Sequence, residues 1–382
     1  MLKLLTIIGA RPQIIKAAAI SRAIKSYYSE EVKEVIVHTG QHYDSKMSGI
    51  FFEELQIPLP NYNLQVGSGK HGEQTAKMIM GIEEILEKEK PDFLVIYGDT
   101  NSTLAGAIAA SKIHVPIVHI EAGLRSYNKK MPEEINRILA DHVSTFLFSP
   151  TITGMKNLQK EGFNLKSIAP FTTDNPGIFN VGDIMYDNSL YFASIASKKV
   201  NILGNLGLEK NKYVLATIHR NNNTDDEIRL NEIFEAFLHI SRDTKIVIPL
   251  HPRTLKQIEK LLDKSLLASL NHANISIIPP VSYLEMIQLE ENSQIIITDS
   301  GGVQKEAYFF SKPCIILRSE TEWIEIIETG SGILCDATKE VIIKTFDFFV
   351  RKEKIIFDNI YGEGDAAINI INILLSSKIE SK

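Results

Sequence analysis

The chain has 382 residues, 44% of them hydrophobic and 23% charged, which is typical of a globular protein with room for two domains. A net charge of −6 argues against broad binding to nucleic acid or anionic membranes, although local arginines could still bind a small anion. The apolar runs are too short to span a membrane, and Cys314 and Cys335 both lie in such runs, so we expect buried, reduced thiols in a cytoplasmic protein.

Strand-like and helix-like segments alternate along the first half of the chain. Several strand-like runs are continuously apolar, as is typical of parallel strands buried on both faces. The expected strands are Leu4–Ile8, Glu34–His38, Phe93–Tyr97, Pro116–Ile120 and Thr145–Phe148. The amphipathic segments between them are Pro12–Lys25, Glu73–Glu89, Ser102–Lys112 and Glu133–His142. This alternation predicts an α/β fold with a doubly wound parallel sheet.

The second half repeats the plan. Its expected strands are Tyr213–Ile218, Lys245–Leu250, Ile275–Ile278, Ile295–Thr298, Pro313–Leu317 and Gly332–Cys335, with helices such as Asp225–Ser241 and Val303–Phe310. A polar stretch with Pro and Gly at residues 167–186 is the expected boundary. We therefore predict domains at residues 1–175 and 176–363, and a C-terminal helix within 364–382 that could pack back on the first domain.

Acidic residues follow two neighbouring strands of the first half where each strand ends. Asp99 comes after Phe93–Tyr97, and Glu121 comes directly after Pro116–Ile120. In open α/β sheets, ligands bind outside the carboxyl ends of the strands. We therefore expect both carboxylates to point into a ligand crevice.

More charges crowd the segment that follows. Glu133 and Glu134 come after Pro132, in a first helical turn where carboxylates stabilise the helix dipole by about 0.3–1 kcal/mol. That role accounts for Glu134, whereas Glu133 has Arg137 as a possible partner four residues on.

Two turns between a strand and a helix have the composition of phosphate-binding sites. The first is Gly9-Ala10-Arg11-Pro12-Gln13, where Arg11 and, one helical turn later, Lys16 could contact an anion at the helix N-terminus. The second is Asp299-Ser300-Gly301-Gly302, whose glycines let backbone amides approach a diphosphate. Glu306 is placed for a ribose hydroxyl. Together the two turns predict a nucleoside diphosphate conjugate as ligand.

Histidines end two strands of the second half, as His219-Arg220 and His251-Pro252. A single histidine in such a place is more often structural than functional. Two of them on crevice-side strand ends favour a functional role.

These motifs, in this order, resemble the non-hydrolysing UDP-N-acetylglucosamine 2-epimerases over roughly residues 3–330. The segments that carry the resemblance are Gly9–Pro12, Gly98–Thr100, Glu121–Arg125, Pro132–Arg137, His219-Arg220, His251-Pro252 and Asp299–Gly302. Further segments are most similar to the branch that acts on UDP-2,3-diacetamido-2,3-dideoxyglucuronate: Thr39–His42, Gly67–Thr75, Val181–Met185 and Thr321–Trp323. Gln13 and Asn221-Asn222 depart from the usual family pattern, as does Asp44.

The resemblance implies two Rossmann-like domains of the GT-B type, with the active site in the cleft between them. It implies a UDP-sugar substrate, a homodimer, no cofactor, no metal, and a product used for surface polysaccharide or lipopolysaccharide. It also implies an allosteric sugar site at Gln41 and His42.

The resemblance further implies a mechanism: anti elimination of UDP to a 2-acetamidoglucal, followed by re-addition with the opposite C2 configuration. Asp99, Glu121 and Glu133 would move the C2 proton, and Lys16 and His219 would stabilise the departing diphosphate. Arg11, Arg137, His251, Ser300, Gly301, Gly302, Glu306 and Arg318 would bind the substrate. A hydrolysing epimerase, a GT-B glycosyltransferase and a regulatory sugar-nucleotide-binding protein remain as alternatives.

Overall fold

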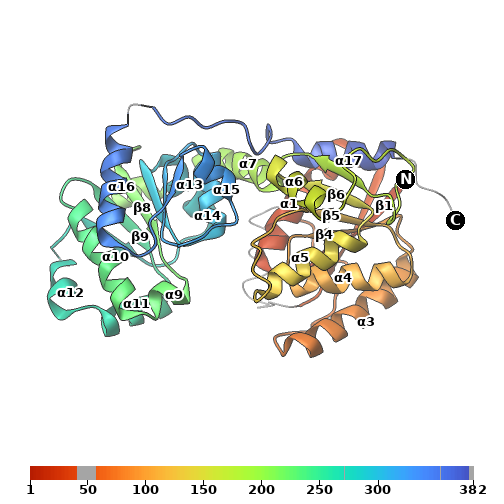
Figure 1. The fold of residues 1–382 in the computed structure, drawn as a ribbon, viewed down its shortest axis with the longest axis horizontal. Helices are drawn as coiled ribbons and strands as arrows, with labels where there is room; N and C mark the ends of the chain where they lie inside the picture. Colours follow the sequence, from red (N-terminus) through yellow and green to blue (C-terminus); the bar gives the residue numbers. More distant parts are fainter. Residues whose placement is uncertain (41–56, 271, 353, 378–382) are drawn as a thin grey trace. The chain divides into compact units, whose positions relative to one another are not determined.

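The computed structural model describes residues 1–40, 57–270, 272–352 and 354–377, and it separates into two compact units (Figure 1). The first unit is Met1–Asn188 with the segment from Ile360 onward, and the second is Ser189–Asn359. The division falls within α7 (Ile184–Lys199). The predicted boundary at 175/176 lies earlier, inside the first unit, because β7 (Gly177–Asn180) pairs in parallel with β6 (Phe146–Ser149).

The described residues of the first unit form a parallel sheet of seven strands in the order β3-β2-β1-β4-β5-β6-β7. Besides β6 and β7, its strands are β1 (Leu2–Ile8), β2 (Val32–His38), β3 (Tyr62–Asn63), β4 (Phe93–Tyr97) and β5 (Ile117–Ile120). All pairings are parallel, so the carboxyl ends of β1, β4 and β5 meet at one edge of the sheet. The turns at Gly9, Gly98 and Glu121 therefore share that edge.

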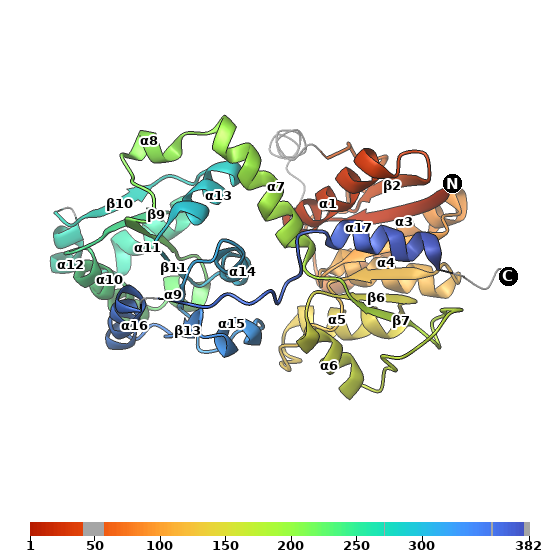
Figure 2. The same cartoon turned by 90° about the horizontal axis from the view of Figure 1, so that it is seen from above.

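Helices cover this sheet. They are α1 (Arg11–Tyr27), α3 (His71–Glu89), α4 (Asn101–Lys112), α5 (Pro132–Val143), α6 (Ile152–Lys160) and α17 (Ala366–Ser376). Helices α3, α4 and α5 pack side by side, and small residues let α4 lie close to the strands: a Cβ on Gly106 would be 3.1 Å from Ile96. Helix α17, from the end of the chain, packs beside α1 (Figure 2).

The second unit repeats the plan with a parallel sheet of six strands in the order β10-β9-β8-β11-β12-β13. The strands are β8 (Tyr213–Thr217), β9 (Lys245–Pro249), β10 (Ile275–Ile278), β11 (Ile295–Thr298), β12 (Cys314–Ile316) and β13 (Gly332–Leu334). The helices are α8 (Ile202–Leu206), α9 (Asn221–Thr224), α10 (Glu227–Ile240), α11 (Pro252–Leu261), α12 (Lys264–Leu270), α13 (Tyr283–Asn292), α14 (Gly301–Phe309), α15 (Ile324–Glu328) and α16 (Lys339–Arg351). Aliphatic and Phe side chains of α10 and α16 pack on β8 and β9 to form an apolar cluster of the second unit.

The two-domain Rossmann-like α/β fold predicted from the sequence is confirmed, and each expected strand and helix lies within two residues of an observed one. The sequence reasoning missed β3, which has two residues, and β7, which lies in the stretch interpreted as a linker. Cys314 and Cys335 are buried free thiols. None of the helices in the described part of the chain is long and apolar enough to cross a membrane.

Candidate active site

Three charged side chains of the first unit meet around the turn after β4. Lys16 Nζ lies 2.6 Å from Glu121 Oε2, and each of the two side chains is about one-tenth exposed. Both lie against Gly98, since a Cβ there would be 3.0 Å from Lys16 Nζ and 3.5 Å from Glu121 Oε1. Gly98 has φ +59°, which favours glycine, so this position needs both its conformation and its missing side chain. Asp99 follows directly.

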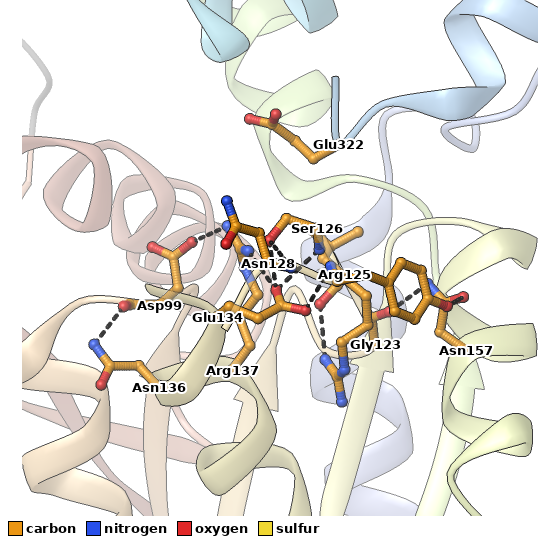
Figure 3. Close-up of polar contacts among 12 residues, drawn as sticks. Asp99, Gly123, Arg125, Ser126, Asn128, Glu134, Asn136, Arg137, Asn157 and Glu322 are labelled. Atoms are coloured by element: carbon orange, nitrogen blue, oxygen red, sulfur yellow. Dashed lines mark hydrogen bonds and ion pairs between the residues drawn. The ribbon is translucent and has the colours of Figure 1, made fainter. Parts of the chain in front are cut away.

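Asp99 and Glu134 share the guanidinium of Arg137 (Figure 3). Arg137 Nη1 lies 3.0 Å from Glu134 Oε2, while Nη2 pairs with Asp99 Oδ2. Burial raises the pKa of Asp99 above its usual value, although the charges of Arg137 and Lys16 act against that rise. A carboxyl group whose pKa is shifted toward neutrality is suited to proton transfer.

Glu134 stands in the first turn of α5 as predicted, but its carboxylate has a further task. It is 1% exposed and accepts hydrogen bonds from the backbone N–H groups of Ser126 and Tyr127, both at 2.9 Å (Figure 3). Burial alone would raise the pKa of Glu134, but these N–H groups and Arg137 hold it below its usual value. Glu134 thus ties the 126–127 loop to α5. The expected partnership of Arg137 with Glu133 is replaced by its pairs with Asp99 and Glu134, and Glu133 is exposed.

A buried charge network supports these strand ends, and the sequence reasoning did not find it. Asp141 accepts from His119 Nδ1 at 2.7 Å, from Arg125 at 2.7 Å and from the Gly123 N–H at 3.1 Å. Burial alone would raise the pKa of Asp141, but His119 and Arg125 hold it below its usual value. Arg125 also forms two hydrogen bonds with Glu161. The spacing of these residues along the chain gives no sign of this network, which depends on the packing of α5 and α6 against the sheet.

The turn Gly9–Gln13, between β1 and α1, is held by the side chain of Gln13 as well as by backbone hydrogen bonds. Its Oε1 accepts from the N–H groups of Gly9 at 2.9 Å and Ala10 at 3.2 Å, and the side chain is 1% exposed. Arg11, two residues earlier, is exposed at the start of α1. The turn therefore presents Arg11 outward on a fixed backbone, as an anion site requires.

In the second unit, Asp299 is the centre of the turn rather than the cap of α14. Its carboxylate is fully buried and accepts from the His219 ring at 3.0 Å, from the backbone of His219 and Arg220, and from Asn223. Burial alone would raise the pKa of Asp299, but His219 and these donors hold it below its usual value. The side chain of His219 remains 56% exposed, so its ring is oriented by Asp299 and accessible to a ligand.

The N-terminus of α14 has no side-chain cap, and the Glu322 carboxylate lies close to it. Ser300 is the N-cap without a capping side-chain bond, and a Cβ on Gly301 would lie 2.5 Å from Glu322 Oε1. Glu322 in turn pairs with Arg318 at 2.9 Å. Burial and the neighbouring carboxyl of Glu306 raise the pKa of Glu290 well above its usual value.

Two of the remaining predicted residues have clear places in the second unit. Arg318 lines a pocket of about 490 Å³, together with Arg220 and residues of α9. His251 is the exposed N-cap of α11, and its Nδ1 accepts from the Arg253 N–H at 3.3 Å. Gln41 and His42, like Asp44, lie outside the described residues.

The folds and the strand-end turns together define a two-domain, Rossmann-like protein of the kind that handles nucleotide sugars. The chain belongs to the UDP-N-acetylglucosamine 2-epimerase family, whose model matches residues 25–375. It is 50% identical over 376 residues to a UDP-N-acetylglucosamine 2-epimerase homolog of Methanococcus maripaludis, covering 98% of this chain and 99% of the relative.

Two further similarities concern the branch of the family to which the chain is most similar. The chain is 48% identical to the UDP-2,3-diacetamido-2,3-dideoxy-D-glucuronate 2-epimerase of Pseudomonas aeruginosa, covering 98% of this chain and 99% of that enzyme. The structure of Methanocaldococcus jannaschii UDP-GlcNAc 2-epimerase, in complex with UDP-GlcNAc and UDP, superimposes with a TM-score of 0.81 at 43% identity. That match covers 98% of this chain and 99% of the other.

Proposed function

We propose that the protein is a non-hydrolysing 2-epimerase of a UDP-linked 2-acetamido sugar. The observation that carries the proposal is the cluster of Lys16, Glu121 and Asp99 at the carboxyl edge of the first sheet, where Asp99 has a raised pKa. Inversion at C2 needs an acid and a base at one carbon. The chain belongs to a family that is named for this reaction, the UDP-N-acetylglucosamine 2-epimerases.

In this proposal the reaction is an elimination followed by an addition. A carboxylate removes the C2 proton while the bond from C1 to the UDP oxygen breaks, leaving a 2-acetamidoglucal and UDP. UDP then adds back to C1 as a proton reaches the opposite face of C2. Asp99, Glu121 and Glu133 are the candidate proton carriers. Glu121 has φ +77°, a strained conformation for a residue other than glycine, which supports a functional placement.

The diphosphate leaving group needs positive charge and backbone donors. Arg11, Lys16 and His219, together with the amides of Ser300, Gly301 and Gly302, would stabilise the charge that develops on it. Arg318 and His251 would bind the nucleotide, and Glu306 its ribose.

The sugar is either UDP-N-acetylglucosamine or the 2,3-diacetamido-glucuronate, and relatives named for each are 43% and 48% identical to the chain. We further propose a cytoplasmic homodimer that supplies precursors for a surface polysaccharide such as lipopolysaccharide. Sedimentation measurements across a range of concentrations would test the dimer.

The direct test is incubation with each UDP-sugar in D₂O, followed by NMR of the sugar. The C2 epimer with deuterium at C2 is the expected product for the correct sugar. Free sugar with UDP would indicate a hydrolysing epimerase, and transfer to an added acceptor would indicate a glycosyltransferase. Bound substrate without any exchange would exclude catalysis.

The proton carriers can be separated by neutral variants of similar shape, namely Asp99→Asn, Glu121→Gln and Glu133→Gln. We expect Glu133→Gln to lower C2 exchange at least a hundredfold while UDP binding stays intact. Glu87→Gln is the matched control, because Glu87 is an exposed residue of α3 that has no part in the proposed mechanism. Normal exchange by Glu133→Gln would remove Glu133 from the mechanism and leave Asp99 and Glu121.

A further inference from the structure

Glu290, near the end of α13, carries a carboxyl group in the interior of the second unit. Its side chain is 0% exposed, and neither of its oxygens has a hydrogen-bond donor among the described residues. No lysine, arginine or histidine of that part of the chain pairs with it. An ionised carboxylate is costly to bury without donors, so this group is expected to be neutral in the folded protein.

The group that faces Glu290 is the carboxyl of Glu306, in the second turn of α14, a helix that packs against α13 (Figure 1). Two ionised carboxylates only accept hydrogen bonds and repel each other, whereas a single proton between them creates a hydrogen bond. Glu306 is 9% exposed and Glu290 is not exposed at all. The proton therefore belongs to Glu290, and the negative charge to Glu306.

The other polar groups around Glu290 are already committed. The Tyr213 hydroxyl donates to the carbonyl of Leu289. Cys314 is a buried thiol, and burial, with the nearby Cys335 and Glu290, holds its pKa above the usual value, so it stays neutral. Glu306 is thus the acceptor to which an O–H of Glu290 can donate.

We propose that Glu290, as a neutral carboxylic acid, is a positioning residue that donates to the Glu306 carboxylate and turns its other oxygen toward the ribose hydroxyls of UDP. This inference rests on the proposed function in one respect, the place of Glu306 at the ribose. Glu290 acts through Glu306 and does not touch the nucleotide. Firm binding of the ribose matters here because UDP leaves the sugar and has to add back to it.

Two variants separate hydrogen-bond donation from shape. In Glu290→Gln the amide still donates to Glu306, whereas Glu290→Met has a side chain of similar length and no donor. Replacing a buried polar group by an apolar one of similar shape can be nearly neutral for stability, so we expect Glu290→Met to fold.

The experiment measures dissociation constants by calorimetry for UDP and for 2′,3′-dideoxy-UDP, which lacks both ribose hydroxyls. We expect the wild type to bind UDP at least about tenfold more tightly than the dideoxy nucleotide. Glu290→Met should bind UDP about five- to twentyfold more weakly and the dideoxy nucleotide within about twofold of the wild type, because only the ribose contact is lost. Glu290→Gln should behave as the wild type does with both ligands.

The matched control is Glu259→Met, the same replacement at an exposed position of α11. Its two dissociation constants should equal those of the wild type. An unchanged preference for UDP in Glu290→Met would overturn the inference, and so would equal losses in Glu290→Met and Glu290→Gln. A wild type that binds the two nucleotides equally would overturn it as well.

The proton itself can be detected without any nucleotide. The infrared difference spectrum between the wild type and Glu290→Gln at neutral pH should contain the band of a protonated carboxyl group. If the wild type binds UDP but epimerises neither sugar, the proposed function fails, while the binding experiment still tests the role of Glu290. If it binds no UDP, the positioning role fails together with the proposed function. A difference spectrum without the band contradicts the inference in every case.

Discussion

Single residues of the first unit combine charge with unusual backbone geometry. Glu121 has φ +77° and lies in contact with Lys16, and both side chains pack on Gly98. Non-glycine residues in this conformation cost about 1–3 kcal/mol and persist only where the surroundings impose it. Here the N–H of Glu121 donates to Phe148 O at 3.0 Å, which ties it to the neighbouring strand. The strain thus places a carboxylate that a relaxed strand end would turn elsewhere.

The buried network of Asp141, His119 and Arg125 makes Asp141 important for the stability of the first unit. Replacing it with asparagine removes the negative charge beside His119 and leaves the buried Arg125 guanidinium with one carboxylate partner fewer. We expect Asp141→Asn to lower the free energy of unfolding by about 3–5 kcal/mol, measured by urea denaturation at pH 7.

The pH dependence gives a second readout of the same change. Because the folded protein lowers the pKa of Asp141, its stabilisation is present above the unfolded value near 4 and is lost on acidification. The difference between wild type and Asp141→Asn should therefore shrink at low pH. Asp347→Asn, at a half-exposed site, should change stability by less than about 1 kcal/mol. A comparable loss in both variants would contradict the assigned role of the network.

At the scale of elements, the C-terminal helix is fastened to α7 by one carboxylate. Asp187 accepts from the N–H groups of Ala366 at 3.1 Å and Ala367 at 2.8 Å, which are the first residues of α17. Nearby, the Asp183 N–H donates to Tyr361 O at 2.9 Å, and Gly182 and Gly362 approach so closely that a Cβ on either would clash. The two segments thus form a joint in the first unit, close to where the chain enters and leaves the second.

Asp187 should make this joint sensitive to pH. Burial raises its pKa to about 6, although the Ala366 and Ala367 N–H groups act against that rise, with Asp183 and Arg22 nearby. The folded protein thus binds this proton more tightly than the unfolded chain, and stability increases as the pH falls through 6 toward 4. From this group we expect a gain of about 2 kcal/mol between pH 7 and pH 4.

Asp187→Asn isolates that contribution. The variant cannot titrate, so the difference in unfolding free energy between wild type and variant should grow in favour of the wild type on acidification. Parallel stability curves for the two proteins between pH 4 and pH 7 would show that Asp187 does not titrate in this range.

At the scale of the whole molecule, each unit has its own apolar core, and α17 returns to the first unit from the far end of the chain. Ile370, Ile371 and Leu374 are buried on its inner face. The last residues of the described chain thus stabilise the unit that contains the first residues.

Ile371→Ala tests this connection. We expect a loss of about 2–5 kcal/mol, because the side chain is fully buried. Hydrogen exchange should become faster in β1 to β7 and stay unchanged in β8 to β13. Ser376→Ala is the control, because Ser376 is exposed and its hydroxyl donates to carbonyls of α17 itself. Faster exchange in both units would mean that they unfold as one.

The sequence by itself determined most strands of both sheets, the Rossmann-like class and the family, because apolar periodicity and strand-end motifs are local signals. It also placed Asp99, Glu121 and the two turns with the composition of phosphate-binding sites at strand ends. Only the tertiary structure decided which residues far apart in the chain contact one another. Examples are Gln13 with Tyr97, Asp299 with His219, and Asp187 with α17. Such hydrogen bonds leave no periodic trace, since they form only when helices and strands from distant segments pack together.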